Sequence, residues 1–565
     1  MDINLNSTKN IKILIFIFLI ALYSLAIFST LNVDLKRPSF STMTWNVNHD
    51  EKLLIPNSRS KYLFDDWGID KYNYHTFFFS FLGTIWQIAG LKIAGLSLAG
   101  IRLSYAIFSL FSAIILGIIF YRKVNSLFFA AFLFIYLFSY NNLCLARLAI
   151  LEHLILVLML LIFAIYFYNK DKFINSYLKW VAFATPFLFL IKMNFPLYLG
   201  LFLMAVIIIH RDKVILKTTL KYFLIGIAGF IGLLVIIYFV NNKVVTELLK
   251  YLSVNVDVML GSFDAKMYQH HIPVLQQHSI FTRYYGSLIF FNPVIKILIY
   301  IFIVLCILLL VLKLIFRTKY SLKMLLTDEL KLLLVYNVLY IIIHTFFYYY
   351  DKRGYPLFVF SYLVICLGIY NVYNSLIGNL SSELKRILTV IFIVIILILA
   401  DNFGDYTISS NVFMKGKNCN LQVSDNSKLL DELLPKENTV VAAHCYPVRF
   451  LCLSKRALFY SGDDQLVCDS DVLKFAVKNK IKYVITAYSI EEIEKYKVIL
   501  GNNKCKKFKE FYFDSDATTS VPFIFNLYNI DYGRDIVKMP ITEYMGYNII
   551  RDYKFNKLKF LNKIL

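Results

Sequence analysis

Apolar runs long enough to cross a membrane recur along this chain from residue 11 to residue 400, and they constrain its fold most strongly. Hydrophobic residues make up 59% of the 565 residues, more than a soluble domain needs. Lipid offers the backbone no hydrogen bonds, so such runs form helices. The predicted spans are 11–31, 101–120, 127–143, 154–168, 178–191, 195–209, 222–240, 290–312, 331–348, 356–372 and 387–400. The chain is therefore predicted to be a polytopic helical membrane protein with about eleven transmembrane helices.

The distribution of positive charge predicts the orientation of these spans. With the N-terminus in the cytoplasm, the inside segments carry clusters of lysine and arginine, including Arg122 with Lys123 and Lys385 with Arg386. The short outside turns hold only Arg147, Lys192, Lys352 and Arg353. The positive-inside rule then predicts that the C-terminus of this multi-pass protein lies outside. The expected location is the plasma (inner) membrane. Much of the net charge of +22 is explained by this bias, so it gives no evidence for a nucleic-acid partner.

The segment 75–95 is apolar but is interrupted by Gln87, Lys92 and three glycines. It is predicted to be a helix at the membrane interface, because one more crossing here would invert every later loop. It belongs to a first extracytoplasmic loop, 33–100. A second large loop is expected at 241–290, within a transmembrane domain that covers residues 1–400.

After Ala400 the long apolar runs end, and residues 401–565 show short alternating elements. Strands are predicted at 439–443, 483–487 and 521–528, with helices at 469–478 and 490–500. This alternation predicts a small extracytoplasmic α/β domain. Five cysteines lie here, and one or two disulfides are expected without a deducible pairing: Cys419, Cys445, Cys452, Cys468 and Cys505. Their spacing matches no zinc signature, and no metal is expected.

Polar residues gather at the predicted outer surface, where a membrane enzyme keeps its chemistry. Asp50 and Glu51 form an acidic pair in the first outer loop. Other candidates are His75, Arg147, Glu152, Lys192, Tyr350 and Arg353. A carboxylate can accept the proton of a nucleophile, and cations can neutralise charge that grows on a departing phosphate. Two simpler interpretations remain open: Asp50 as a solvated loop residue, and Arg147 with Glu152 as an ion pair that fixes helix packing.

Six short motifs occur in an order that resembles the GT-C superfamily of membrane glycosyltransferases, especially the protein O-mannosyltransferases and the lipid A aminoarabinose transferase. They are Asp50-Glu51, the segment from His75 to Leu82, Gly100-Ile-Arg-Leu-Ser-Tyr, Ala146-Arg-Leu-Ala-Ile-Leu-Glu, Phe189-Leu-Ile-Lys-Met-Asn and Asp351-Lys-Arg-Gly-Tyr-Pro-Leu. The chain departs from the family pattern where the paired prolines after His75 and the proline after Arg102 are missing. Donor placement along that helix is therefore left open.

The resemblance implies a polyprenyl-phosphate-linked sugar as donor. It further implies that Asp50 is the general base of an inverting transfer and that Glu51 orients the acceptor or Asp50. His75, Arg147, Lys192 and Arg353 would bind the donor phosphate, while Glu152 and Tyr350 would orient the reacting groups. The closer group needs no catalytic metal, and no cofactor is expected.

Two other functions remain as alternatives: a lipid-linked glycan flippase or exporter, and a glycan polymerase or ligase. A transporter would line its path with polar residues, whereas the middles of these spans are mostly Leu, Ile, Phe and Val. A polymerase or ligase usually carries one large late outer loop. Glycosyl transfer is therefore favoured, with membrane lipids around the protein and a lipid, glycan or protein as acceptor. The sequence identifies neither the sugar nor the acceptor.

Overall fold

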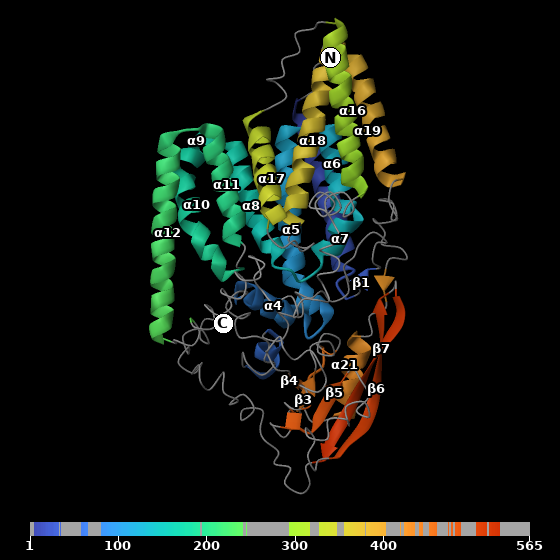
Figure 1. Ribbon diagram of the computed structural model, residues 1–565. Coiled ribbons are helices and arrows are strands. Elements are labelled where there is room, and N and C mark those ends of the chain that lie inside the picture. Colours follow the sequence, from blue (N-terminus) through green and yellow to red (C-terminus); the bar gives the residue numbers. More distant parts are fainter. Residues whose placement is uncertain are drawn as a thin grey trace.

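The computed structural model describes residues 5–32, 34–35, 58–65, 81–192, 195–240, 245, 293–316, 327–346, 355–378, 380–402, 418–419, 423–434, 440–443, 451, 453–459, 473, 476–477, 481–486, 504–516 and 519–531. It consists of a helical bundle and a β-sheet at one end of that bundle (Figure 1).

Long apolar helices form the bundle (Figure 1). The first half contains α1 (Leu5–Phe28), α5 (Leu98–Lys123), α6 (Ser126–Phe138), α7 (Tyr140–Ala146), α8 (Glu152–Tyr168), α11 (Phe195–His210) and α12 (Lys213–Val240). Between α8 and α11 runs a continuous helical segment made of α9 (Lys170–Lys172), a π-helical turn (Phe173–Tyr177), α10 (Leu178–Ala184) and the 3-10 helix η2 (Thr185–Leu190). The second half contains α16 (Pro293–Phe316), α17 (Asp328–Phe346), α18 (Tyr355–Ile377) and α19 (Ser382–Asn402).

Each of the eleven apolar segments coincides with one of these helices or helical runs, so the prediction of a polytopic helical protein is confirmed. Six helices among the described residues are long and apolar enough to cross a membrane by length and composition. The number of eleven spans stays a prediction. The segment 178–191 is extended at its start to Lys170, because α9 and the π-turn continue the helix toward α8.

Ion pairs join the ends of these helices on the side away from the sheet. Lys123 Nζ lies 2.6 Å from Glu329 Oε1, and Lys170 Nζ lies 2.6 Å from Asp328 Oδ2. These contacts bring the end of α5 and the start of α9 to the first turn of α17. The sheet-distal end of the bundle therefore carries cations from the segments that the charge pattern assigns to the inside.

The predicted interfacial helix is α4 (Phe81–Ala94), whose 14 residues are fewer than the roughly 17 of a membrane span. Its glycines let it cross α5 closely: a Cβ on Gly90 would lie 2.4 Å from the carbonyl oxygen of Gly100. Gly95 then ends α4 in the left-handed region, with φ +72°, and the Ser97 side chain caps α5. The glycines that interrupt the apolar pattern thus serve helix packing.

The sheet has five strands: β3 (Val440–Ala443), β4 (Ala457–Phe459), β5 (Tyr483–Thr486), β6 (Lys504–Asp516) and β7 (Thr519–Asp531). Their order is β4-β3-β5-β7-β6, with β4, β3 and β5 parallel and with β7 antiparallel to both β5 and β6. The predicted strands 439–443, 483–487 and 521–528 are confirmed as β3, β5 and β7. Leu473, Ala476 and Val477 of the predicted helix 469–478 are helical, whereas 490–500 lies outside the described residues.

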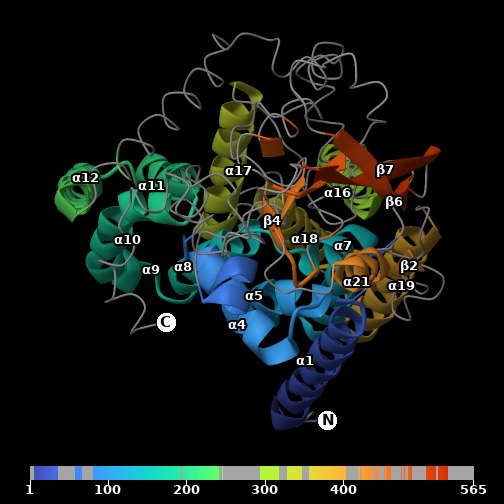
Figure 2. The same cartoon turned by 90° about the horizontal axis from the view of Figure 1, so that it is seen from below.

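Helix α21 (Val423–Leu433) accompanies the sheet, and a short second sheet ties this region to the start of the chain. There β1 (Asp34–Leu35) pairs antiparallel with β2 (Asn418–Cys419). Seen from the sheet end, β6 and β7 lie toward one side of the bundle and α12 toward the other (Figure 2). The first loop and the region after α19 thus meet at the same end of the bundle.

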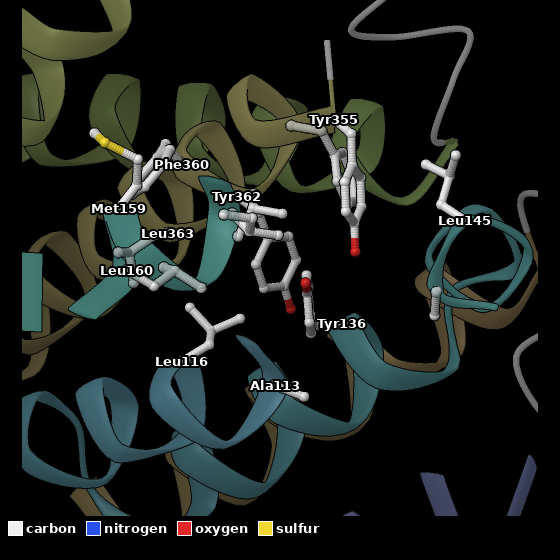
Figure 3. Packing of buried hydrophobic residues seen from close by; sticks show 14 of the residues in the cluster. Ala113, Leu116, Tyr136, Leu145, Met159, Leu160, Tyr355, Phe360, Tyr362 and Leu363 are labelled. Carbon is white, nitrogen blue, oxygen red and sulfur yellow. The ribbon is translucent and has the colours of Figure 1, made fainter. Parts of the chain in front are cut away.

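The interior of the bundle is filled by aromatic and aliphatic side chains (Figure 3). Tyr136, Tyr355 and Tyr362 are fully buried, and the rings of Tyr136 and Tyr362 lie 5.6 Å apart. The Tyr362 hydroxyl donates to the Phe132 carbonyl at 2.6 Å, which satisfies its polar atom inside the core. This part of the bundle is a packed core, as the apolar middles of the spans predict.

Candidate functional site

The buried charges of the described residues lie at the end of the bundle that faces the sheet. Among their Arg, Lys, Asp and Glu side chains, those that are buried are Arg59, Arg102, Arg147, Glu152 and Arg456. Arg102 lies in the first turns of α5, Arg147 directly follows α7, and Glu152 begins α8. A buried charge is costly beside an apolar bundle unless it has a partner or a task, so this end is where a functional site is expected.

Two of these arginines approach the same point of the chain. Arg102 Nη1 donates to the Leu31 carbonyl at 3.3 Å, and Arg147 Nη1 donates to the Thr30 carbonyl at 3.1 Å. Thr30 and Leu31 follow the end of α1, where helix carbonyls carry partial negative charge. Guanidinium groups from α5 and from the α7–α8 connection thus bind two consecutive carbonyls just after the end of α1.

A buried ion pair joins Glu152 and Lys192, which both follow Arg147 in the sequence. Lys192, which follows η2, pairs through Nζ with Glu152 Oε1. The Glu152 side chain is fully buried, and that of Lys192 is 19% exposed. The second carboxylate oxygen, Oε2, has no hydrogen-bond partner among the described residues. The ion partner of Glu152 is Lys192, so interpreting Arg147 and Glu152 as an ion pair is wrong: Arg147 is turned toward α1 instead.

A network of buried polar side chains connects four helices, α1, α5, α7 and α18. Asn142 of α7 donates to the Tyr23 hydroxyl at 3.1 Å and accepts from the Tyr355 hydroxyl at 3.0 Å. Tyr23 also shares a hydrogen bond of 3.2 Å with Ser109 of α5. The ring of His153 lies edge-on to Tyr355, with centroids 5.4 Å apart. The network fixes the start of α18, which follows the loop that contains Arg353.

The structure describes three of the predicted site residues: it pairs Lys192 with Glu152, and it places Arg147 on the Thr30 carbonyl at the same end of the bundle. The others lie outside the described residues: Asp50, Glu51, His75, Tyr350 and Arg353. The sequence prediction left Arg102 out of the site, although the structure places it beside Arg147 at the end of α1. Arg102 could have been found in the sequence as a charge inside an apolar run, because charged residues inside membrane spans usually have a function.

No group of three His, Cys, Asp or Glu side chains within the described ranges could hold a metal ion. The charged groups near the end of α1 and the start of α8 are the guanidiniums of Arg102 and Arg147, the Lys192 ammonium and the Glu152 carboxylate. Such a set binds anionic oxygen through charge-assisted hydrogen bonds. The arrangement therefore suits a phosphate and a hydroxyl-bearing ligand at this end of the bundle.

No protein-family model matches this chain, and no curated protein matches it. Two solved structures share most of its length. The crystal structure of ArnT from Cupriavidus metallidurans in the apo state has a TM-score of 0.49 and 14% identity, covering 91% of this chain and 97% of that chain. The structure of the same protein bound to undecaprenyl phosphate has a TM-score of 0.47 and 14% identity, covering 90% and 97%.

Proposed function

We propose that this protein is a membrane glycosyltransferase. It moves a sugar from a polyprenyl-phosphate donor to a lipid, glycan or protein acceptor at the membrane face where the sheet lies. The observation that carries this proposal is the gathering of buried Arg102, Arg147 and Glu152 at one end of an apolar bundle. The acidic pair Asp50-Glu51 belongs to the loop that leaves α1 at that same end.

Arg102 and Arg147 supply the positive charge that sugar transfer from a phosphate leaving group needs. A guanidinium presents a planar fork of donors that matches phosphate oxygens, and its charge persists at every physiological pH. Beside an apolar bundle the effective dielectric is lower than in water, so each contact to the anion is stronger. Arg102 and Arg147 can therefore stabilise the charge that develops on the phosphate when the bond to the sugar breaks. Lys192, His75 and Arg353 are proposed to complete this phosphate site.

Asp50 is proposed as the general base. Its carboxylate would take the proton of the acceptor hydroxyl as that oxygen attacks the anomeric carbon, and the phosphate would leave from the opposite face, which inverts the configuration. Glu51 would orient the acceptor. Glu152 holds Lys192 with one oxygen, and its Oε2 can accept a hydrogen bond from a sugar hydroxyl, which supports its orienting role. Tyr350 is proposed to help in this positioning.

Transfer by the purified protein tests the function directly. Wild-type protein in detergent, given a panel of undecaprenyl-phosphate sugars and acceptors, is expected to form a glycosidic product detectable by mass spectrometry. A flippase needs a sealed membrane and forms no such bond. An inert wild type that nevertheless moves a lipid-linked sugar across proteoliposomes would contradict the proposal.

The proposed orientation predicts which residues a membrane-impermeant thiol reagent reaches. Asp65→Cys and Lys455→Cys lie on exposed positions at the sheet end, so both are expected to label in intact cells. Asp212 and Glu383 are exposed at the starts of α12 and α19, at the bundle end away from the sheet. Asp212→Cys and Glu383→Cys should therefore label only after permeabilisation. Wild-type protein, with its native cysteines, gives the background. Labelling of Asp212→Cys in intact cells would reverse the proposed topology.

Donor binding is expected to depend on Arg147. Losing a charge-assisted contact to phosphate costs about 1.5–3 kcal/mol, so Arg147→Ala should weaken undecaprenyl-phosphate binding by about ten- to a hundredfold. His75→Ala and Arg353→Ala should act in the same direction. Binding is measured on purified protein by microscale thermophoresis.

The matched control for this prediction is Arg122→Ala. Arg122 lies at the opposite end of α5, where its guanidinium packs 4.1 Å from the ring centre of Tyr168. Arg122→Ala should therefore leave the affinity for undecaprenyl phosphate unchanged. Equal affinity in Arg147→Ala and wild type would remove Arg147 from the phosphate site.

A further inference from the structure

Ser58 and Arg59 are neighbours in the helix of residues 58–64, and they bind two different parts of the fold. Ser58 Oγ donates to the side-chain oxygen of Gln87 on α4, and Gln87 Nε2 donates to the Ile101 carbonyl of α5 at 3.4 Å. Ser58 and Gln87 are fully buried. One side of this short helix is therefore anchored on the bundle.

Arg59 reaches the region that contains the sheet. Its Nε donates to the Ser454 carbonyl at 3.0 Å, and its Nη2 donates to the carbonyls of Ser454 and Arg456. Only 1% of Arg59 is exposed, and Ser454 and Arg456 are buried as well. A single guanidinium thus binds two carbonyls of the turn 454–456, which directly precedes β4.

That turn is shaped in advance by Asp431 of α21. The carboxylate accepts hydrogen bonds from Ser454 Oγ at 2.5 Å and from the Lys455 backbone N–H at 2.9 Å. The Asp431 carbonyl accepts from Arg456 Nη2 at 2.8 Å. Because these bonds fix residues 454–456, the two carbonyls that Arg59 binds are held in place by the fold after α19.

A second anchor lies before the acidic pair in the sequence. In the β1–β2 sheet, Asp34 pairs with Cys419 and Leu35 pairs with Asn418. Strands β1 and β2 and the Arg59 contact therefore tie the chain to the region after α19 on both sides of residues 36–57. Asp50 and Glu51 belong to that stretch of sequence.

We infer that Arg59 is a positioning residue. Through it, the C-terminal region holds the loop that contains the general base, Asp50, in a fixed position on the bundle. Arg59 acts by docking on the turn 454–456, while Ser58 keeps the same helix on α4. This inference rests on the proposed function. A general base works only when it is held near its substrate, and a misplacement of about 1 Å costs about a hundredfold in rate.

The kinetics of Arg59→Ala test this role. Its kcat for sugar transfer is expected to fall about a hundredfold, while its Kd for undecaprenyl phosphate stays that of the wild type. Arg59→Lys should recover part of the loss, because an ammonium can bind one of the two carbonyls. Asp65→Ala is the control, because Asp65 is 89% exposed and its ion partner Lys61 lies in the same segment. It should have wild-type kcat.

A disulfide tests the second anchor without using activity. Leu35→Cys with Asn418→Cys, in a Cys419→Ser background, is expected to cross-link on mild oxidation, because register partners in a sheet meet disulfide geometry. After cleavage at a protease site inserted between residues 250 and 280, the two halves should stay linked until reductant is added. Adding Arg59→Ala to this variant should give a kcat that rises on oxidation and falls on reduction.

The outcomes separate this inference from the proposed function. Wild-type kcat in Arg59→Ala, or a parallel loss of kcat and donor affinity, overturns the positioning role. Failure of residues 35 and 418 to cross-link overturns the second anchor. A wild type without any transfer activity removes the proposed function and the positioning role with it, whereas the cross-link would still establish the contact between β1 and β2.

Discussion

Asp50→Asn is expected to lower sugar transfer by about two to four powers of ten while the protein stays folded, inserted and able to bind donor. The amide keeps the shape of the carboxylate and some of its hydrogen bonds, but it cannot take a proton. General-base contributions usually have this size. The measurement compares kcat of purified wild type and variant with an undecaprenyl-phosphate sugar, alongside Kd for undecaprenyl phosphate.

Glu51→Gln is the matched comparison for this prediction. A second carboxylate beside the base orients the acceptor but does not receive the same proton, so its loss should cost less rate. If Asp50 is a solvated loop residue, both variants will transfer sugar at near wild-type rates. An active Asp50→Asn protein would end the assignment of Asp50 as base.

The largest effect on stability is expected from breaking the buried pair of Glu152 and Lys192. Lys192→Met removes the cation that Glu152 binds and leaves a fully buried carboxylate behind. Removing one partner of a buried pair costs about 3–5 kcal/mol, and the partial exposure of Lys192 places the loss near the lower value. The thermal midpoint in detergent, read by intrinsic fluorescence, should fall accordingly.

The double variant Glu152→Leu with Lys192→Met should regain much of that stability, since replacing both charges by apolar groups is often neutral. It should still transfer sugar poorly, because the orienting carboxylate is gone. Lys170→Met is the control: the Lys170–Asp328 pair is 38% and 45% exposed, so its loss should cost at most about 1 kcal/mol. Equal losses of stability in Lys192→Met and Lys170→Met would show that the buried Glu152–Lys192 pair contributes no more to stability than the exposed Lys170–Asp328 pair.

The sequence predicts the helices of the bundle well because a membrane span leaves a strong local signal. The backbone of each apolar segment must form its hydrogen bonds within the segment, because lipid offers none. This requirement places α1, α5 and α18 close to their observed bounds. The charge pattern also anticipated that Lys123 and Lys170 meet at one bundle end. Arg147, Glu152 and Lys192 were found because each is a charge beside a span.

What the sequence does not reveal are contacts between distant segments. Arg59 reads as one more cation in a polar loop, and only the fold shows that it binds the turn 454–456. Strand β6 was missed because its lysines and acidic residues suggest a solvated segment, although charged side chains commonly protect strands at the edge of a sheet. The pairing of Glu152 with Lys192 was missed because Lys192 lies 40 residues away in the chain, whereas Arg147 is a near neighbour of Glu152 in the sequence.

The contact of Arg59 with Ser454 also sets an order for the biogenesis of the protein. The two residues are 395 positions apart in the chain, so the contact cannot form until residue 454 of the 565 has been synthesised. At translation rates of about 5–20 residues per second, the first loop waits for about 20–80 s after it is made. During that interval every helix from α5 to α19 is synthesised. The loop that carries Asp50 would therefore receive its final anchor only on a chain whose bundle is already in the membrane, so that partly made protein remains inactive.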